Sequence, residues 1–202
     1  MGERLNEFDR PEYVDFLLSE WGPPDAPAPY YAGRMTFIVS YIRGDTVLDA
    51  GCGLGHLYHE MRRQYDNSKQ YLGMDISPAM LKYAKYYCPD VSFIKDDIKI
   101  FNVKADSIVC TDVLIHQEDI KPFVDNMWKN ATKELIFTMN CSKDITEKRA
   151  WDGPITFPEG LTMRKMSKEN VLAVLAQLDD VLQVEVFVWD ELTSIFRVTR
   201  NV

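Results

Sequence analysis

The sequence contains few cysteines and no long apolar run. Its four cysteines, Cys52, Cys88, Cys110 and Cys141, are scattered over 202 residues without a CxxC pair. This pattern favours reduced thiols in a cytoplasmic protein. The opening MGERLNEFDRPEYVDFLLSEW is acidic, whereas a signal peptide has a basic start and an apolar stretch. No run of about twenty apolar residues is present, so we expect no membrane partner.

Positive charge is also scarce. Lysine and arginine number 23 against 31 aspartates and glutamates, which gives a formal charge of −8. A protein that binds a nucleic-acid backbone by releasing counterions needs a basic patch, and none is visible. Nucleic acid is therefore disfavoured as a partner. The length suits one domain with a substantial core, so we treat 1–202 as a single domain of undefined oligomeric state.

From residue 45 onward, short apolar runs alternate with amphipathic helices. DTVLDAG precedes LYHEMRRQY, QYLGMD precedes PAMLKYAKYY, and DSIVCTD precedes DIKPFVDNMWKNA. This alternation predicts an α/β fold, a Rossmann-like doubly wound and mostly parallel sheet with helices on both faces. At the end of the chain, VLQVEVFVW and LTSIFRVTR are separated only by Asp190 and Glu191. So short a join predicts an antiparallel C-terminal hairpin.

The remaining segments are expected to be helices and a connector. Apolar spacing predicts one helix over 10–21 and a second over RMTFIVSYIR, ending near Gly44. Between them, GPPDAPAPYYAG contains too much proline for regular structure and is expected to be a stiff connector. Ser77 and Ser167 are the expected N-caps of two later helices.

The stretch VLDAGCGLGHLYHEM carries the strongest functional signal. Its glycines at 51, 53 and 55 lie between a predicted strand and a predicted helix, where backbone N–H groups are free to meet a ligand. A dinucleotide fingerprint reads G-x-G-x-x-G, but the sixth position counted from Gly51 is His56. Instead, Asp49 at the strand end is followed by alternating glycines, which we expect to leave room for a ligand against the backbone.

This motif resembles the first motif of the class I S-adenosylmethionine-dependent methyltransferases. Three further stretches match that family in order: YLGMDISPAML with Asp75, VSFIKDDI with Asp97, and DSIVCTDVLIHQED. Each match is weak alone, but four in order at plausible spacing are specific. The resemblance implies S-adenosylmethionine as the cofactor and methyl transfer as the reaction.

The resemblance also implies roles for individual residues. Asp75 would accept hydrogen bonds from the ribose diol, and Asp97 would accept from the adenine amino group, with Asp96 as the alternative. Asp49 would serve the cationic amino end of the cofactor. The complete set of expected cofactor-binding residues is Tyr31, Arg34, Asp49, Gly51, Cys52, Gly53, Gly55, His56, Asp75, Ile76, Asp97, Ile98, Cys110 and Thr111.

The resemblance divides the chain into four parts. Residues 1–44 would form a helical lid, from which Arg34 would pair with the cofactor's carboxylate. Residues 45–140 would be the cofactor-binding core and 167–202 the C-terminal helix and hairpin. Residues 141–166 would shape the acceptor pocket, and Trp151, Phe157 and Met163 in this insertion are either pocket walls or a small satellite core.

His116 follows the fourth predicted strand, so it is either a general base or a packing residue at the next helix. His56 and His59 have no acidic or thiol partner in register, and no metal is inferred. The NPPY and DPPY motifs of amino-group methylation in nucleic acids and proteins are absent, which favours a small-molecule acceptor. A non-catalytic binding module and, less favoured, an NAD-dependent oxidoreductase are the alternatives.

Overall fold

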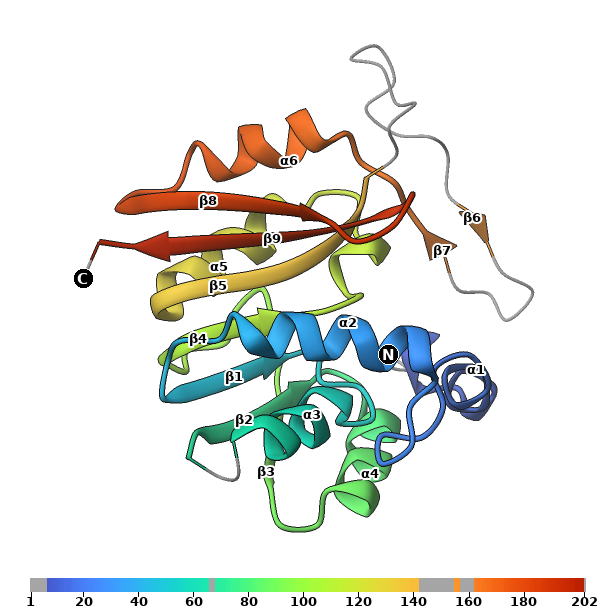
Figure 1. Cartoon of the computed structure of the whole chain (residues 1–202). Helices are drawn as coiled ribbons and strands as arrows, with labels where there is room; N and C mark the ends of the chain where they lie inside the picture. The colour runs from blue at the N-terminus through green and yellow to red at the C-terminus, as the bar shows by residue number, and fades with distance from the viewer. Residues whose placement is uncertain (1–6, 66–67, 142–154, 157–161, 202) are drawn as a thin grey trace, which may run out of the picture.

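The computed structural model describes residues 7–65, 68–141, 155–156 and 162–201. A seven-stranded sheet with the order β3-β2-β1-β4-β5-β9-β8 is flanked by helices on both faces (Figure 1). Its strands are β1 Thr46–Ala50, β2 Gln70–Asp75, β3 Ser92–Lys95, β4 Ala105–Cys110, β5 Ala131–Asn140, β8 Val181–Val188 and β9 Thr193–Arg200. The helices are η1 Glu7–Asp9, α1 Pro11–Trp21, α2 Pro29–Ser40, α3 His56–Tyr65, α4 Pro78–Tyr87, η2 Leu114–His116, α5 Lys121–Asn130 and α6 Lys168–Leu175.

The predicted sheet is confirmed. Strands β1 to β5 pair in parallel, whereas β9 pairs antiparallel with both β5 and β8. Because β9 lies between β5 and β8, the C-terminal hairpin extends the sheet on one side, and β8 forms its edge. A second, two-stranded sheet pairs β6 Ile155–Thr156 with β7 Thr162–Met163, and the expected pocket residues Trp151 and Phe157 lie outside the described residues.

Two apolar cores cover the two faces of the sheet. Successive residues of a strand point to opposite faces, so Val47 of β1 joins the core under α2 and α3 while Leu48 joins the core under α5 and α6. Both side chains are almost fully buried, at 2% and 0% exposure. This two-sided burial explains why the parallel strands are continuous apolar runs in the sequence.

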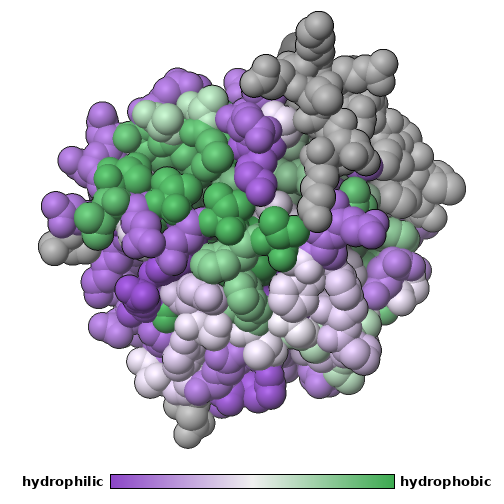
Figure 2. All heavy atoms as spheres, turned by 45° about the horizontal axis from the view of Figure 1, so that its top comes forward, coloured by the Kyte–Doolittle hydropathy of each residue, from purple (hydrophilic) through white to green (hydrophobic). Residues whose placement is uncertain are grey.

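The edge of the sheet leaves apolar side chains on the surface. Figure 2 shows hydrophobic atoms gathered over the side of the molecule that carries β8 and α6. Leu182 and Val188 of β8 are 61% and 52% exposed, whereas β9 is buried along most of its length. The central strands therefore hold the core, and the edge strand is only half covered.

The N-terminal connector is shorter than the sequence predicts. The prediction of a stiff connector through Gly33 is wrong, because α2 begins at Pro29 and includes Tyr30, Tyr31 and Gly33. Proline at the first helical position has its φ angle already set and has no N–H to leave unpaired, so it starts the helix rather than preventing it. The two expected serine N-caps are confirmed: Ser77 accepts from the Met80 N–H and Ser167 from the Asn170 N–H.

Within the described residues, every helix is too short or too polar to cross a bilayer.

Candidate functional site

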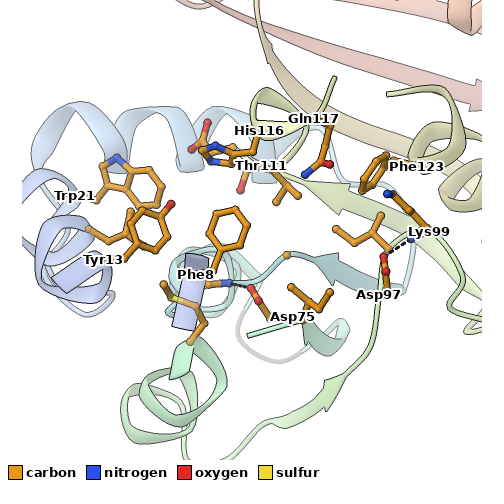
Figure 3. Close-up of a pocket in the computed structure, with 18 residues that line it drawn as sticks. Phe8, Tyr13, Trp21, Asp75, Asp97, Lys99, Thr111, His116, Gln117 and Phe123 are labelled. Atoms are coloured by element: carbon orange, nitrogen blue, oxygen red, sulfur yellow. Dashed lines mark hydrogen bonds between the residues drawn. The ribbon is translucent and has the colours of Figure 1, made fainter. Parts of the chain in front are cut away.

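A cavity of about 260 Å³ lies at the carboxyl ends of the parallel strands, beneath α1 and η1 (Figure 3). Ligands of open parallel sheets bind at this end, because the strand-to-helix loops expose backbone N–H groups there. The cavity is lined by Phe8, Tyr13, Leu17, Trp21, Gly51, Gly53, Asp75, Ile76, Met80, Asp97, Ile98, Lys99, Thr111, Asp112, Val113, His116, Gln117 and Phe123.

The three glycines of the loop after β1 have different reasons for being glycine. All three have positive φ angles: 83° at Gly51, 53° at Gly53 and 96° at Gly55. A Cβ at Gly51 would overlap Val113, although Gly51 lines the cavity, and one at Gly55 would lie 2.7 Å from the Cys88 sulfur, so at both positions a side chain would collide with the protein itself. Only at Gly53 would a Cβ meet no atom within 4 Å, so this glycine alone opens onto free space.

Asp75 closes the floor of the cavity at the end of β2. Its Oδ2 accepts from the Gly53 N–H at 2.9 Å and its Oδ1 from the Ser77 N–H at 2.9 Å. Burial raises the pKa of this carboxyl, although the backbone hydrogen bonds oppose the shift. Each oxygen has a second lone pair, so the carboxylate can also accept from a vicinal diol.

Another part of the cavity combines apolar side chains with an acid. Ile98 lines it together with Phe123 of α5, and the Lys99 ammonium lies 4.7 Å from the centre of the Phe123 ring. Of the two candidate acids, Asp97 lines the cavity and Asp96 does not; the Lys99 N–H donates to Asp97 Oδ1 at 2.9 Å. These surroundings suit a planar heterocycle with an amino group.

Asp49 belongs to the end of β1, just before the glycine loop, and is not part of the cavity lining. It is 1% exposed, and its Oδ2 accepts from the Tyr71 hydroxyl at 2.6 Å. Its Oδ1 has no hydrogen-bond partner among the described residues. Burial, reinforced by the nearby Asp75 and opposed by the Tyr71 hydrogen bond, raises the pKa of Asp49 to about 7. A buried, incompletely paired carboxylate at this point fits a cofactor with a cationic end.

Arg34 contacts a protein carboxylate at the cavity wall. Its guanidinium forms a buried ion pair with Asp112, and its Nε has no partner among the described residues. Asp112 has a φ of 58°, and its backbone N–H donates to the Thr138 hydroxyl at 2.7 Å. The ion pair therefore ties α2 to the strained turn after β4, a contact between residues far apart in the sequence.

Several expected cofactor-binding residues support the wall from behind. Tyr31 stacks on Trp21 with ring centres 4.6 Å apart, and the His56 ring nitrogen contacts the Gly22 carbonyl oxygen at 2.9 Å. Burial lowers the pKa of His56 to about 4, so this imidazole is neutral near pH 7. The expected residues that do not line the cavity are Tyr31, Arg34, Asp49, Cys52, Gly55, His56 and Cys110.

His116 projects into the cavity from η2, and the N-terminal segment closes over it. The Phe8 ring meets the His116 ring edge-on at 5.3 Å, and the Phe8 carbonyl oxygen accepts from the Ser77 hydroxyl at 3.0 Å. Sequence reasoning missed Phe8, Tyr13 and Trp21 as wall residues. The aromatic spacing of 10–21 predicts a helix face, but it does not say which surface that face covers.

Comparison with known proteins identifies the family. A family model described as a methyltransferase domain matches residues 43–197. Cyclopropane-fatty-acyl-phospholipid synthase of Escherichia coli (strain K12) is 31% identical over 158 residues, which are 73% of this chain and 41% of the relative. The chain thus spans about two fifths of the length of the curated relatives it matches.

Solved structures agree with the fold. Magnesium protoporphyrin IX methyltransferase from Synechocystis PCC 6803 with bound S-adenosylmethionine has a TM-score of 0.68 at 16% identity, covering 100% of both chains. Human N-acetylserotonin methyltransferase, also in complex with S-adenosylmethionine, has a TM-score of 0.70 at 14% identity, covering 98% of this chain and 57% of that one.

The fold and the glycine loop define a Rossmann-like domain with a cavity at the carboxyl ends of its strands, where open parallel sheets bind their ligands. Since the family model covers most of the chain, the protein belongs to the class I S-adenosylmethionine-dependent methyltransferases.

Proposed function

We propose that the protein transfers a methyl group from S-adenosylmethionine to a small-molecule acceptor. One observation carries the proposal: the Asp75 carboxylate and the open face of Gly53 meet in one cavity at the ends of β1 and β2. A carboxylate for the ribose diol beside a side-chain-free backbone is the arrangement that an adenosyl cofactor needs. The four buried cysteines are free, which supports a reducing, cytoplasmic setting.

The cavity residues would divide the cofactor between them. Asp75 would hold the ribose, while Ile98 and Phe123 would enclose the adenine, with Asp97 accepting from its amino group. The methionine part would lie over Gly53, towards Asp112. Residues 1–44 remain our proposed lid, supported by the packing of α1 side chains against Leu54 of the glycine loop.

The acceptor would enter beside the aromatic wall. Phe8, Tyr13 and Trp21 give that end of the cavity an apolar surface, and His116 faces it (Figure 3). The bound cofactor supplies an electrophilic methyl group on its sulfonium, so the protein has to align the acceptor and exclude water. His116 would take the proton from a hydroxyl or amine acceptor, which makes it our candidate catalytic residue.

The curated relative suggests a second candidate acceptor. Its name places its action on the fatty acyl chain of a phospholipid, and it is 31% identical to this chain. The apolar wall formed by Phe8, Leu17 and Trp21 supports an acyl chain as well as a small ring. In this case carbon would be the acceptor atom.

Isothermal titration with S-adenosylmethionine, S-adenosylhomocysteine and NAD tests the cofactor. We expect micromolar binding of the first two and no binding of NAD. Asp75→Ala should weaken binding by about 1–3 kcal/mol, since the diol loses its buried acceptor. Asp96→Ala is the matched control, because this acid lies outside the cavity lining, and it should bind as the wild type does. Unchanged affinity in Asp75→Ala would disprove the assignment.

Methyl transfer itself is tested by following S-adenosylhomocysteine formation. The acceptor panel comprises phenols, primary amines and vesicles of a phospholipid with unsaturated acyl chains. Turnover with a phenol or amine that falls in His116→Gln supports the small-molecule proposal, and turnover only with the vesicles selects the acyl chain. Cofactor binding without turnover on any acceptor favours the non-catalytic module.

A further inference from the structure

Two carboxyl groups are buried at the ends of β1 and β2, and neither is paired with a cation of the described residues. Asp49 and Asp75 are 1% and 8% exposed, and no ion pair reaches either of them within the described part of the chain. Asp75 is stabilised by backbone N–H donors, but the side chain of Asp49 receives a single hydrogen bond, from the neutral phenol of Tyr71. Of the two carboxyl groups, Asp49 therefore has fewer hydrogen bonds to stabilise a negative charge.

The ionisable groups around Asp49 are neutral or acidic. Arg34, the buried cation of α2, forms its ion pair with Asp112. The groups that couple electrostatically to Asp49 come from α2, the glycine loop, β2, the end of α4 and β4, and they are Tyr31, Cys52, Tyr71, Asp75, Cys88 and Cys110.

An ionised Asp49 is therefore costly in the cofactor-free protein. A buried carboxylate without a counter-charge is stabilised by taking up a proton, and its raised pKa of about 7 places this uptake near neutral pH. A cation bound over the glycine loop would reverse the balance, because Asp49 precedes Gly51, which lines the cavity, by only two residues. The thiols of Cys52 and Cys110 do not contribute to proton release near neutral pH, since burial raises the pKa of both.

We propose, on the basis of the proposed function, that Asp49 carries a proton in the cofactor-free site and releases it to solvent when S-adenosylmethionine binds. The O–H bond of the carboxyl breaks, and the carboxylate then balances the positive charge of the cofactor. Tyr71 is a positioning residue, because its phenol donates to Oδ2, while Oδ1 accepts no hydrogen bond from the described residues.

This linkage distinguishes the methyl donor from the product. S-Adenosylmethionine has a sulfonium, an ammonium and a carboxylate, for a net charge of about +1, whereas S-adenosylhomocysteine has lost the sulfonium charge. The donor should therefore release more protons than the product. Methyl transfer removes the sulfonium charge and would therefore favour return of the proton to Asp49. The protein would then bind the product more weakly than the donor.

Calorimetry in buffers of different ionisation enthalpy measures the effect directly. The slope of the binding enthalpy against the buffer's ionisation enthalpy gives the number of protons released. With Asp49 half-protonated at pH 7, we expect roughly half a proton for S-adenosylmethionine, less for S-adenosylhomocysteine, and none at pH 9. Asp49→Asn should abolish most of the release while keeping measurable binding.

Three further variants make the test specific. Tyr71→Phe removes the hydrogen bond that lowers the pKa of Asp49, so maximal release should move to higher pH. Tyr65→Phe is the matched control, since its hydroxyl donates to the carbonyl oxygen of Val39, and it should leave the release unchanged. His116→Gln should also retain it. Binding without proton release, or release lost in His116→Gln, would overturn the linkage; absence of any binding would instead refute the proposed function.

Discussion

Two of the places where the described sheet buries charge are built differently. Between β5 and β9, both Nε and Nη2 of Arg197 donate to Glu134 Oε2, at 2.9 and 2.7 Å. Glu134 Oε1 accepts from the Ser107 hydroxyl at 2.6 Å and from the Arg43 N–H at 2.6 Å. At the ends of β1 and β2, by contrast, Asp49 Oδ1 has no hydrogen-bond partner among the residues that the structure describes.

This difference distinguishes a charged pair that stabilises the fold from a buried acid that we assign to ligand binding. The Glu134–Arg197 pair is 1% and 3% exposed, and its carboxylate oxygens are fully used within the protein, so it needs no ligand. The Asp49 carboxyl is equally buried, but its Oδ1 has no hydrogen-bond partner in the described part of the chain, and in our proposal the cofactor supplies the missing charge. An incompletely paired buried acid beside a cavity is therefore the better guide to a binding site than burial or charge alone.

Removing one member of the Glu134–Arg197 ion pair should produce the largest loss of stability. Glu134→Ala leaves the Arg197 guanidinium buried without its main partner, so we expect the free energy of unfolding to fall by about 3–5 kcal/mol. Urea unfolding monitored by circular dichroism measures this loss. At low temperature, where the variant remains folded, its affinity for S-adenosylhomocysteine should match that of the wild type.

The matching control removes both charges of the pair. Glu134→Leu combined with Arg197→Met should recover much of the lost stability, because no uncompensated ion remains in the core. A double variant less stable than Glu134→Ala would contradict the assignment of the loss to a stranded charge.

Removing the Asp49 carboxyl should change the free energy of unfolding by less, and the change should depend on pH. The folded pKa of Asp49 is raised, so its protonated form stabilises the fold at low pH, and this stabilisation is lost as the pH rises from about 4 to about 7. Asp49→Asn cannot ionise and should gain stability relative to the wild type over that interval, by on the order of 3 kcal/mol. Unfolding of both cofactor-free proteins at pH 4, 5.5, 7 and 8 measures the difference. A constant difference across this range would show that Asp49 is already ionised at pH 4.

The sequence was sufficient for features that depend on local order. The alternation of apolar runs and amphipathic helices predicts the sheet, and the two-residue join at Asp190 and Glu191 predicts its antiparallel end. Asp75, Asp97 and Gly53 were proposed from the resemblance to the family's motifs, and all three line the cavity.

Other features depend on contacts between distant segments and were not predictable. Arg34 and Asp112 are 78 positions apart, and only the folded chain shows that the arginine pairs with this acid. The closure of Phe8 over His116 likewise depends on how η1 packs. The glycine pattern was recognised, but its reasons were not, because the neighbours of Gly51 and Gly55 come from other parts of the chain.

Substitutions in the glycine loop should have the smallest effects on stability, and they allow a direct comparison of two neighbouring glycines. Gly53→Ala places a methyl group in open space, so its stability cost should be limited to the left-handed backbone, about 1–2 kcal/mol. The same methyl group would occupy the cavity and should weaken S-adenosylhomocysteine binding at least about tenfold, a penalty of about 1.4 kcal/mol.

Gly51→Ala is its matched partner, with the same backbone requirement but a different neighbour. Its methyl group would overlap Val113, so it should cost about 1–3 kcal/mol more in stability than Gly53→Ala. Val113→Ala introduced together with Gly51→Ala should remove part of this excess, while leaving the effect of Gly53→Ala untouched. Thermal unfolding of these variants and the wild type measures the cost in stability, and calorimetric titration measures the cost in cofactor binding. Equal stability losses for the two glycine variants would mean that the loop shifts freely, and the open face at Gly53 would then lose its claim to be the cofactor surface.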